Sequence, residues 1–434
     1  MPDVVAVPGL RGTSSFTLEG QRPKSFREAT LRLHINGTAP LTALSGYMKT
    51  QSVDDPEFSW FEKLDPELAA DATNVYTDEA MTSVYASGAV AGDHLHVKMG
   101  ADDAKFFRAG QTCVITDKDN FKKHVFGIIF NRVVNGASSR ISVTLITPDT
   151  YVMGGATTKR LLMSGTASSE GASSPDAISF DPTKRMNYTQ IFRTPLWITR
   201  TARKTRLRTG DALAECRRDA FDIHQNGRER AYWFGEKSEG TGENGQPRRT
   251  TQGVLSLILE RVPDNWVKYD LDADYAQKRW IVGGMSWFNS NLERIFRYGG
   301  PTRVGYCGGL ALLAINEMCQ ANSQMNLTPA QTSFGMKVMR WITPFGEVLL
   351  KTHPMFVREP SLQRALALIE PENMRRRVID DTMLKKDDGE NKGGVANHDG
   401  LKDEYLTEDG LEIQLAEGFG FFDGLGVDNT VAAA

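Results

Sequence analysis

Residues 209–235 read TGDALAECRRDAFDIHQNGRERAYWFG, and the rest of the chain is organised around this stretch. Its small and apolar residues recur at steps of three and four: Leu213, Cys216, Ala220, Ile223, Gly227, Ala231 and Phe234. That spacing predicts one narrow stripe along an α-helix. Because the stripe contains several small residues, it also predicts that something flat, a β-sheet, lies close against it.

The ends of this helix carry recognisable signals. Thr209 is predicted to cap the N-terminus, and Asp211 suits the positive end of the helix dipole. Gly235 follows the last periodic residue, where helices commonly end. A helix of this length would be about 39 Å long. The face opposite the stripe is charged and is predicted to point away from the sheet; it carries Arg217, Arg218, Asp219, Asp222, Arg228 and Glu229.

Composition limits the class of protein. The chain has 434 residues, enough for two or three domains, and its 51 basic and 54 acidic residues give a net charge of −3. This balance argues against a dedicated nucleic-acid binder, although one face could still be basic. Four distant cysteines without a CxxC motif predict neither a zinc site nor a disulfide framework and fit a reducing compartment. Neither a signal peptide nor a membrane-spanning helix is predicted.

Before residue 209 the chain is predicted to be extended or looped. Residues 1 to about 55 have no sustained period, so we expect an arm that is disordered or lies across another surface. Residues 54–64 are expected to form a short helix or anchor. Residues 74–165 show strand-like alternation, with Asn135-Gly136 as a hairpin turn, and predict a small barrel or sandwich. We interpret it as an inserted module at about residues 90–160.

A basic extended segment is predicted at residues 181–208, after a flexible loop at 164–175. It holds eight Lys and Arg residues against the single acid Asp181, and Tyr188, Phe192 and Trp197 interleave with the charge. Lysine and arginine can contact nucleic-acid phosphates, acidic patches of a protein partner, or solvent alone. All three alternatives remain open on charge alone.

After the helix, the pattern predicts a compact α+β body. A glycine-rich polar loop is expected at 237–251, and the folded body begins at Gly253. Helices are predicted at about 290–298 and 310–320, and paired strands at 334–342 and 346–353. Residues 385–404 are expected to form a solvated linker, and 411–415 a final strand.

No pattern in the sequence predicts catalysis, a metal or a cofactor. His94 and His96 would share a strand face, but no carboxylate or third histidine completes a ligand set. The glycine-rich stretches at 239–245 and 305–309 match neither the P-loop nor the dinucleotide fingerprint. The seven histidines are scattered, and none lies beside a serine or cysteine in a nucleophile context.

The order of these parts resembles the major head protein, or major capsid protein, of tailed bacteriophages with the Hong Kong 97-like fold. Several strings sharpen the resemblance: residues 55–62 (DPEFSWFE), Glu170-Gly171, 187–192 (NYTQIF), 199–202 (TRTA), Phe334-Gly335, 343–346 (TPFG), His353-Pro354 and 404–412 (EYLTEDGLE). Each string is weak alone, and their order carries the resemblance. It covers most of residues 55–415.

The resemblance implies a domain organisation. Residues 1–55 would be the N-terminal arm, and 56–208 an extended loop that lies over an adjacent subunit and contains the inserted module. Residues 209–250 would form the spine helix and the start of the peripheral domain, 251–370 the axial domain, and 371–434 the return to the peripheral domain with the C-terminal tail.

The resemblance also implies a function: a structural, non-catalytic subunit that self-assembles into an icosahedral head around double-stranded DNA. Expected partners are copies of the chain in pentamers and hexamers, a portal, separate scaffold or decoration proteins, and packaged DNA in weak contact. Assembly is expected in the bacterial host cytoplasm, and the product is the virion capsid. The candidate inter-subunit contacts are Phe58, Trp60, Glu170, Arg185, Tyr188, Phe192, Arg193, Trp197, Arg200, Arg203, Arg217, Arg218 and Arg228.

Two rival functions come from other classes. One is a hydrolase with an N-terminal β carbohydrate-binding module, which would need a pocket with convergent titratable groups. The other is a protein that coats nucleic acid through residues 181–208.

Overall fold

The computed structural model describes residues 44, 48–150, 159–171, 173, 175, 177–205, 210–321, 327–333, 336–386 and 400–431. The predicted arm therefore lies almost entirely outside the described residues, as does most of the predicted linker. The chain divides into two compact units, residues 1–60 with 185–434 and residues 61–184. Each unit is described by itself.

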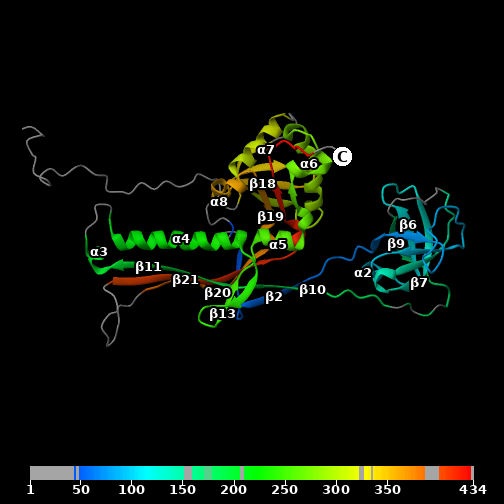
Figure 1. Cartoon of the computed structure of the whole chain (residues 1–434), viewed down its shortest axis with the longest axis horizontal. Helices are drawn as coiled ribbons and strands as arrows, with labels where there is room; N and C mark the ends of the chain where they lie inside the picture. The colour runs from blue at the N-terminus through cyan, green and yellow to red at the C-terminus, as the bar shows by residue number, and fades with distance from the viewer. Residues whose placement is uncertain are drawn as a thin grey trace, which may run out of the picture. The chain divides into compact units, whose positions relative to one another are not determined.

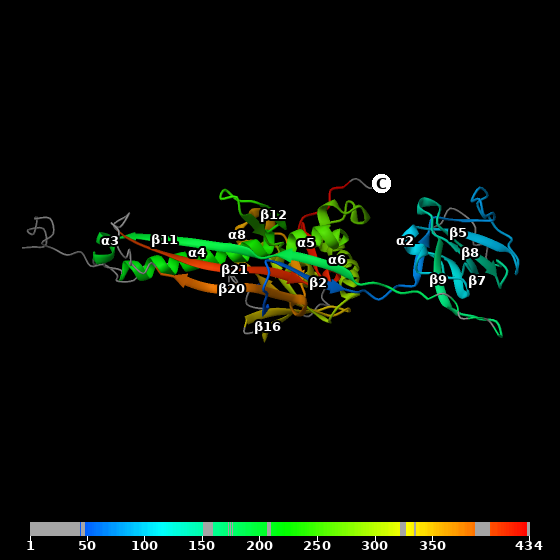
Figure 2. The same ribbon diagram turned by 90° about the horizontal axis from the view of Figure 1, so that it is seen from below.

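The centre of the first unit is the helix α4 (Ala212–Phe234), which lies on a four-stranded sheet (Figures 1 and 2). The strand order is β1 (Lys49–Ser52), β20 (Met374–Lys385), β21 (Gly400–Ile413) and β11 (Gln190–Thr199). β21 pairs antiparallel with both β20 and β11, while β1 adds a short parallel edge. The predicted helix on a sheet is thus confirmed, and its C-cap is Gly235, as predicted.

Two details of the helix differ from the prediction. The N-cap is Asp211, whose side chain accepts the Leu213 N–H at 3.0 Å, and Thr209 lies outside the described residues. The face packed on the sheet is also different. Ala220 of the predicted stripe is buried, as predicted, but Ile223 and Phe234 of that stripe are exposed, and His224 and Arg228 are buried in their place. The interface is largely polar because the sheet presents buried acidic and hydroxyl groups that need partners from the helix.

The remainder of the first unit is built on a seven-stranded sheet (Figure 1). Its order is β14 (Trp266–Lys268), β22 (Gly420–Asp423), β19 (Leu366–Ile369), β15 (Thr302–Cys307), β18 (Glu347–Thr352), β17 (Met336–Ile342) and β16 (Leu327–Ser333). β19 and β15 are buried almost throughout, as expected for strands covered on both faces.

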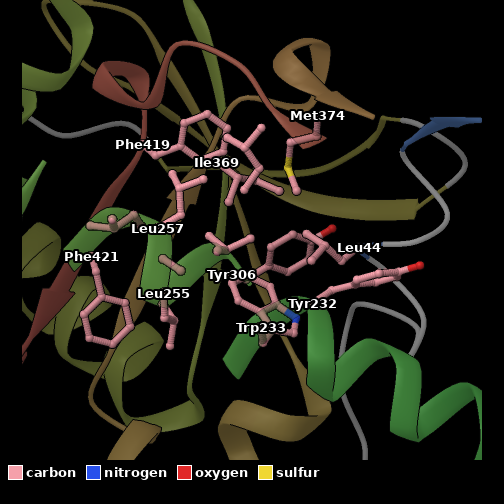
Figure 3. Close-up of a cluster of buried hydrophobic side chains, with 14 of the residues drawn as sticks. Leu44, Tyr232, Trp233, Leu255, Leu257, Tyr306, Ile369, Met374, Phe419 and Phe421 are labelled. Carbon is pink, nitrogen blue, oxygen red and sulfur yellow. The ribbon is translucent and has the colours of Figure 1, made fainter. Parts of the chain in front are cut away.

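Each face of the seven-stranded sheet has its own hydrophobic cluster. On one face, α6 (Trp280–Phe296) and α7 (Gly309–Ala321) supply Trp287, Phe288 and Ile315. On the other, α5 (Val254–Arg261), α8 (Pro354–Arg358) and the end of α4 meet the strands. Figure 3 shows this second cluster, with Tyr232 and Trp233 of α4 beside Tyr306 of β15 and Leu44. The same cluster includes Met374, Leu411 and Ile413, so it joins the seven-stranded sheet to the sheet under α4.

The second unit is a small closed barrel around its own core. Its strand order is β3 (Ala69–Ala72), β9 (Lys159–Thr166), β6 (Gln111–Asp117), β7 (His124–Val133), β8 (Arg140–Leu145), β5 (His94–Lys98) and β4 (Asn74–Tyr76). The first and last strands of this order, β3 and β4, are separated in sequence only by Thr73. Together they act as one bent strand that pairs with β9 on one side and with β5 on the other, which closes the sheet. Val97, Ile115, Val125 and Ile141 fill the inside. The short helix α2 (Ala101–Ala104) joins β5 to β6.

Several local predictions need correction. Residues 57–62 form the strand β2, with Phe58 and Trp60 buried and Phe61 exposed in alternation, instead of a helix. Residues 183–188 form β10, which pairs with β2. The basic segment is extended only to Thr199, because Arg200–Lys204 form the short helix α3 capped by Thr199. The last strand is β22, not residues 411–415, which mostly belong to the end of β21.

The glycine-rich stretch after α4 is ordered as a hairpin. β12 (Ser238–Thr241) and β13 (Pro247–Thr250) pair antiparallel, with Glu239 opposite Arg249. Gly245 takes the left-handed backbone conformation at the tip, with φ of +76°. The hairpin stands beside β11, and the two together border a groove.

Candidate inter-subunit surface

The outer face of β11 carries two of the predicted contact residues, Arg193 and Trp197, and both are exposed. Alternation along this strand turns Phe192, Thr194 and Leu196 inward and Ile191, Arg193 and Trp197 outward. Trp197 is 64% exposed, and the ammonium of Lys402 lies 5.9 Å from its ring centroid. An exposed tryptophan on a strand is a common anchor of protein interfaces.

Arg193 is held in place on this outer face. Its Nη2 donates to both oxygens of Glu404 on the neighbouring strand β21, at 2.8 and 2.7 Å. Because the Arg193 side chain is 61% exposed, the pair sets the direction of the side chain more than it stabilises the subunit. Arg200 and Arg203 follow on α3 and are also exposed. The outer face of β11 with α3 therefore combines an apolar anchor with several cations.

The predicted contact residues of α4 separate into two groups. Arg218 is exposed, as predicted. Arg217 and Arg228 instead turn toward the sheet, contrary to the prediction that they share an outward face. Arg217 donates through Nε to the buried carboxylate of Asp403 at 2.8 Å, and Arg228 Nε lies 3.4 Å from Asp409. Glu229, predicted on the same outward face, is fully buried.

The remaining candidates also differ in exposure. Phe58, Trp60 and Tyr188 are buried within the first unit, where Phe58 and Trp60 stack with ring centroids 6.2 Å apart. Phe58 packs on Gly410 of β21, where a side-chain carbon would come within 2.8 Å of the ring. Arg185 and Phe192 are half-buried, and Glu170 is exposed. That these residues contact another subunit stays a prediction.

His224 is a buried titratable group between α4 and the sheet. It is 2% exposed, and its two ring nitrogens lie 3.0 Å from Thr194 Oγ1 and 2.7 Å from Thr407 Oγ1. Burial lowers the pKa of His224, and the positive charge of Arg228 adds to this effect, while Asp409 opposes it. The ring is therefore neutral in the folded chain, where it bridges β11 and β21.

Acid should weaken the subunit through His224. Its pKa is lower in the folded than in the unfolded chain, so between these two values the unfolded chain binds more protons. The free energy of unfolding therefore falls as the pH drops below about 6.5. Urea titrations at several pH values should show this loss, on the order of 1 kcal/mol per unit of pKa difference, and a smaller loss in His224→Gln. His94→Gln, at an exposed histidine of the other unit, is the control; equal pH dependence in all three proteins would contradict the assignment.

The sequence did not reveal a second exposed apolar surface, on the helices α6 and α7. Ile281 and Val282 are 51% and 74% exposed at the start of α6, and Leu310 and Leu313 are 38% and 51% exposed on α7. Trp280 Nε1 donates to the carbonyl of Ala314 at 2.9 Å, which brings the start of α6 to the middle of α7. We call these four residues the α6–α7 apolar surface. Consecutive apolar residues in α6 were the available signal, since a single amphipathic stripe cannot bury all of them.

The described residues show little sign of a metal site, a reactive cysteine or a membrane-spanning helix. Among them, no group of three or more His, Cys, Asp or Glu is arranged to hold a metal ion. Burial raises the pKa of the Cys113 and Cys307 thiols to about 12, which keeps both protonated and unreactive. No helix within the described ranges has the length and apolar character needed to cross a membrane.

Two comparisons of the sequence with known proteins both identify similarity to phage major capsid proteins. The family model described as SU10 major capsid protein matches residues 12–426. The major capsid protein of Pseudomonas phage PaMx41 is 26% identical over 399 residues, which cover 86% of this chain and 84% of that protein.

Solved capsid structures are also similar. The match to the capsid protein of an empty GTA particle has 10% sequence identity and a TM-score of 0.48, and it covers 96% of this chain and 99% of that chain. The match to the capsid protein of Myoviridae phage XM1 has 9% sequence identity and a TM-score of 0.42, and it covers 96% of this chain and 100% of that chain. Because these TM-scores are below 0.5, family membership rests on the family model that matches residues 12–426.

Proposed function

Because this chain belongs to the SU10 major capsid protein family, the structural subunits of phage heads, we propose that its copies form pentamers and hexamers that close into an icosahedral shell around double-stranded DNA. The subunit is structural and not enzymatic, and it is part of the virion. Assembly takes place in the cytoplasm of the bacterial host. A portal and separate scaffold or decoration proteins are its further partners.

The observation that carries this proposal is the α6–α7 apolar surface. Four large aliphatic side chains on two adjoining helices are each more than a third exposed in the isolated chain. Exposed large aliphatic side chains on adjoining helices favour burial against a neighbouring subunit in an oligomer. We place this surface between copies around the five-fold and six-fold axes, within the axial domain of residues 251–370.

The other predicted domains have matching roles in the proposal. The arm at 1–55 and the extended loop at 56–208 reach neighbouring copies with the parts that do not pack in their own first unit, as Leu44, β1, β2 and β11 do. The spine helix and residues 371–434 form the peripheral domain. The net charge of −3 supports weak, non-specific contact with packaged DNA, since a protein that grips DNA strongly is basic.

Expression of the chain in bacteria, followed by sedimentation and negative-stain microscopy, tests the proposal. Closed particles are expected from the wild-type chain, and only unassembled but folded subunits from Leu313→Glu, because Leu313 is 51% exposed and a charge there is costly only when a neighbour buries it. Leu313→Met keeps an apolar side chain and should assemble. A wild-type chain that remains a 48.1 kDa monomer would overturn the proposal.

A further inference from the structure

The sequence contains four Asn-Gly pairs: Asn36-Gly37, Asn135-Gly136, Asn226-Gly227 and Asn244-Gly245. In such a pair the backbone nitrogen of the glycine can attack the side-chain carboxamide of the asparagine, because glycine has no Cβ to obstruct the approach. The reaction releases ammonia and leaves a carboxylate. The first pair lies outside the described residues, and the other three stand in different kinds of structure.

The pair Asn135-Gly136 lies in the loop that joins β7 to β8, and both residues are exposed. Asn135 has φ of −148° and ψ of 72°, outside the helix and strand regions, and its side chain does not cap the short helical turn that follows. Within the described part of the chain, neither the Asn135 carboxamide nor the Gly136 N–H has a hydrogen-bond partner. Both groups that must react are therefore free.

The pair Asn244-Gly245 is equally exposed, at the tip of the β12–β13 hairpin, but both of its reacting groups are engaged. The Gly245 N–H donates to the carbonyl of Gly242 at 3.0 Å. Asn244 Oδ1 accepts the Gln246 N–H at 3.2 Å. The Gly245 nitrogen must break its hydrogen bond before it can lose its proton and turn toward the carboxamide, which slows the reaction.

The pair Asn226-Gly227 lies inside the helix α4. There the Gly227 N–H donates to the carbonyl four residues earlier, and turning this peptide toward the Asn226 side chain would break the helix. The three described pairs thus form a series: one with both groups free, one held in a turn, and one held in a helix. The dipeptide is the same in all three, so structure alone sets the order.

We propose that Asn135 is a site of spontaneous modification, at which the folded chain converts this asparagine into aspartate and isoaspartate. The Gly136 nitrogen gives its proton to hydroxide and bonds to Cγ of Asn135. The Cγ–Nδ2 bond breaks, and the amide nitrogen takes a proton from water and leaves as ammonia, which gives a cyclic imide. Water then adds to one of the two ring carbonyl carbons and breaks its bond to the Gly136 nitrogen. Water is the only co-reactant.

The modification changes this loop of the barrel in two ways. Each event adds one negative charge to the exposed surface. Isoaspartate also lengthens the main chain by one carbon between residues 135 and 136, beside the fully buried Ser139. Ser139 Oγ accepts the Asn135 N–H at 2.9 Å and donates to the Gly136 carbonyl at 2.8 Å, so the added carbon separates two groups that Ser139 holds together.

Peptide mapping by mass spectrometry, after incubation of the purified folded chain at neutral pH, tests the proposal. Products at Asn135 should accumulate faster than at Asn244 on the order of tenfold, the factor that corresponds to one hydrogen bond, and those at Asn226 should be slowest. In the guanidinium-unfolded chain the three rates should become similar. Asn135→Gln should abolish the product at residue 135, because glutamine must close a larger ring, and the control Asn244→Gln should leave it unchanged.

Two results would overturn the inference: products that form in the folded chain at Asn244 or Asn226 as fast as at Asn135, or an Asn135 that reacts only after unfolding. The measurement uses unassembled subunits, so it does not depend on shell formation. A chain that forms no particles would overturn the proposed function and leave this order of rates unchanged.

Discussion

Arg303→Met should lower the free energy of unfolding of the subunit by about 3–5 kcal/mol, the cost of breaking a buried ion pair from one side. Arg303 is fully buried and lies 3.2 Å from Glu370, which is 4% exposed. Its guanidinium also donates to four backbone carbonyls, those of Tyr298, Gly300, Thr302 and Gly418. Methionine fills a similar volume but leaves Glu370 and these carbonyls without the donor.

Two further variants separate the causes of this loss. Arg303→Lys keeps the charge, but an ammonium cannot reach all the acceptors of the planar fork, so an intermediate loss is expected. Arg297→Met breaks the exposed pair with Glu293 on α6, where the two side chains are 56% and 45% exposed, and should change stability by less than about 0.5 kcal/mol.

Urea unfolding of the unassembled subunits, followed by tryptophan fluorescence, measures these differences. A loss below about 1 kcal/mol for Arg303→Met would mean that water replaces the guanidinium at its acceptors. That result would contradict a structural role in which Arg303 ties the end of α6 and the loop before β22 to the seven-stranded sheet.

The family and the fold class could be predicted from the sequence. The role of major capsid protein is confirmed by the family match over residues 12–426, and the α+β class with a long helix on a sheet is confirmed by the structure. The hydrolase and nucleic-acid-coating alternatives receive no support. The order of segments was sufficient because arm, β-rich insertion, long helix and α+β body each leave a distinct local pattern.

Local periodicity predicted elements better than it predicted their partners. The ends of α4 were placed to within a few residues, since caps and spacing act within one or two turns. Its buried face was wrong because the partners of His224 and Arg228 are Thr407 and Asp409, almost two hundred positions later. Nothing near residue 224 indicates that a histidine will be buried.

The same limit applies to the candidate surface. The sequence predicted an extended segment in which aromatic residues interleave with charge, but not which residues share a face; the structure exposes Arg193 and Trp197 on the same side of β11. The pattern along α4 could not show that Arg217 and Arg228 form ion pairs within the chain, because their partners, Asp403 and Asp409, lie far away in β21. The closure of the barrel was also hidden, since it depends on the bend at Thr73 between two very short strands.

Asp409→Leu should destabilise the subunit about as strongly as Arg303→Met, by about 3–5 kcal/mol. Asp409 is fully buried beneath α4, where Arg376 Nε donates to its Oδ2 at 2.6 Å and Arg228 Nε lies 3.4 Å away. The two arginines are 8% and 4% exposed. Without the carboxylate, two cations remain buried with only partial compensation, from Asp381 for Arg376 and from the Thr382 hydroxyl for Arg228.

The triple variant Asp409→Leu, Arg228→Met, Arg376→Met should regain most of that stability, because apolar side chains of similar volume replace a buried ionic triad without desolvation cost. Urea unfolding of the single and triple variants measures this recovery, and a triple variant as unstable as Asp409→Leu would contradict it. If stability recovers but closed particles do not form, the charges serve to hold α4 in one register on the sheet. Leucine and methionine would permit that helix to slide along β21, whereas the arginine–aspartate pairs fix its position.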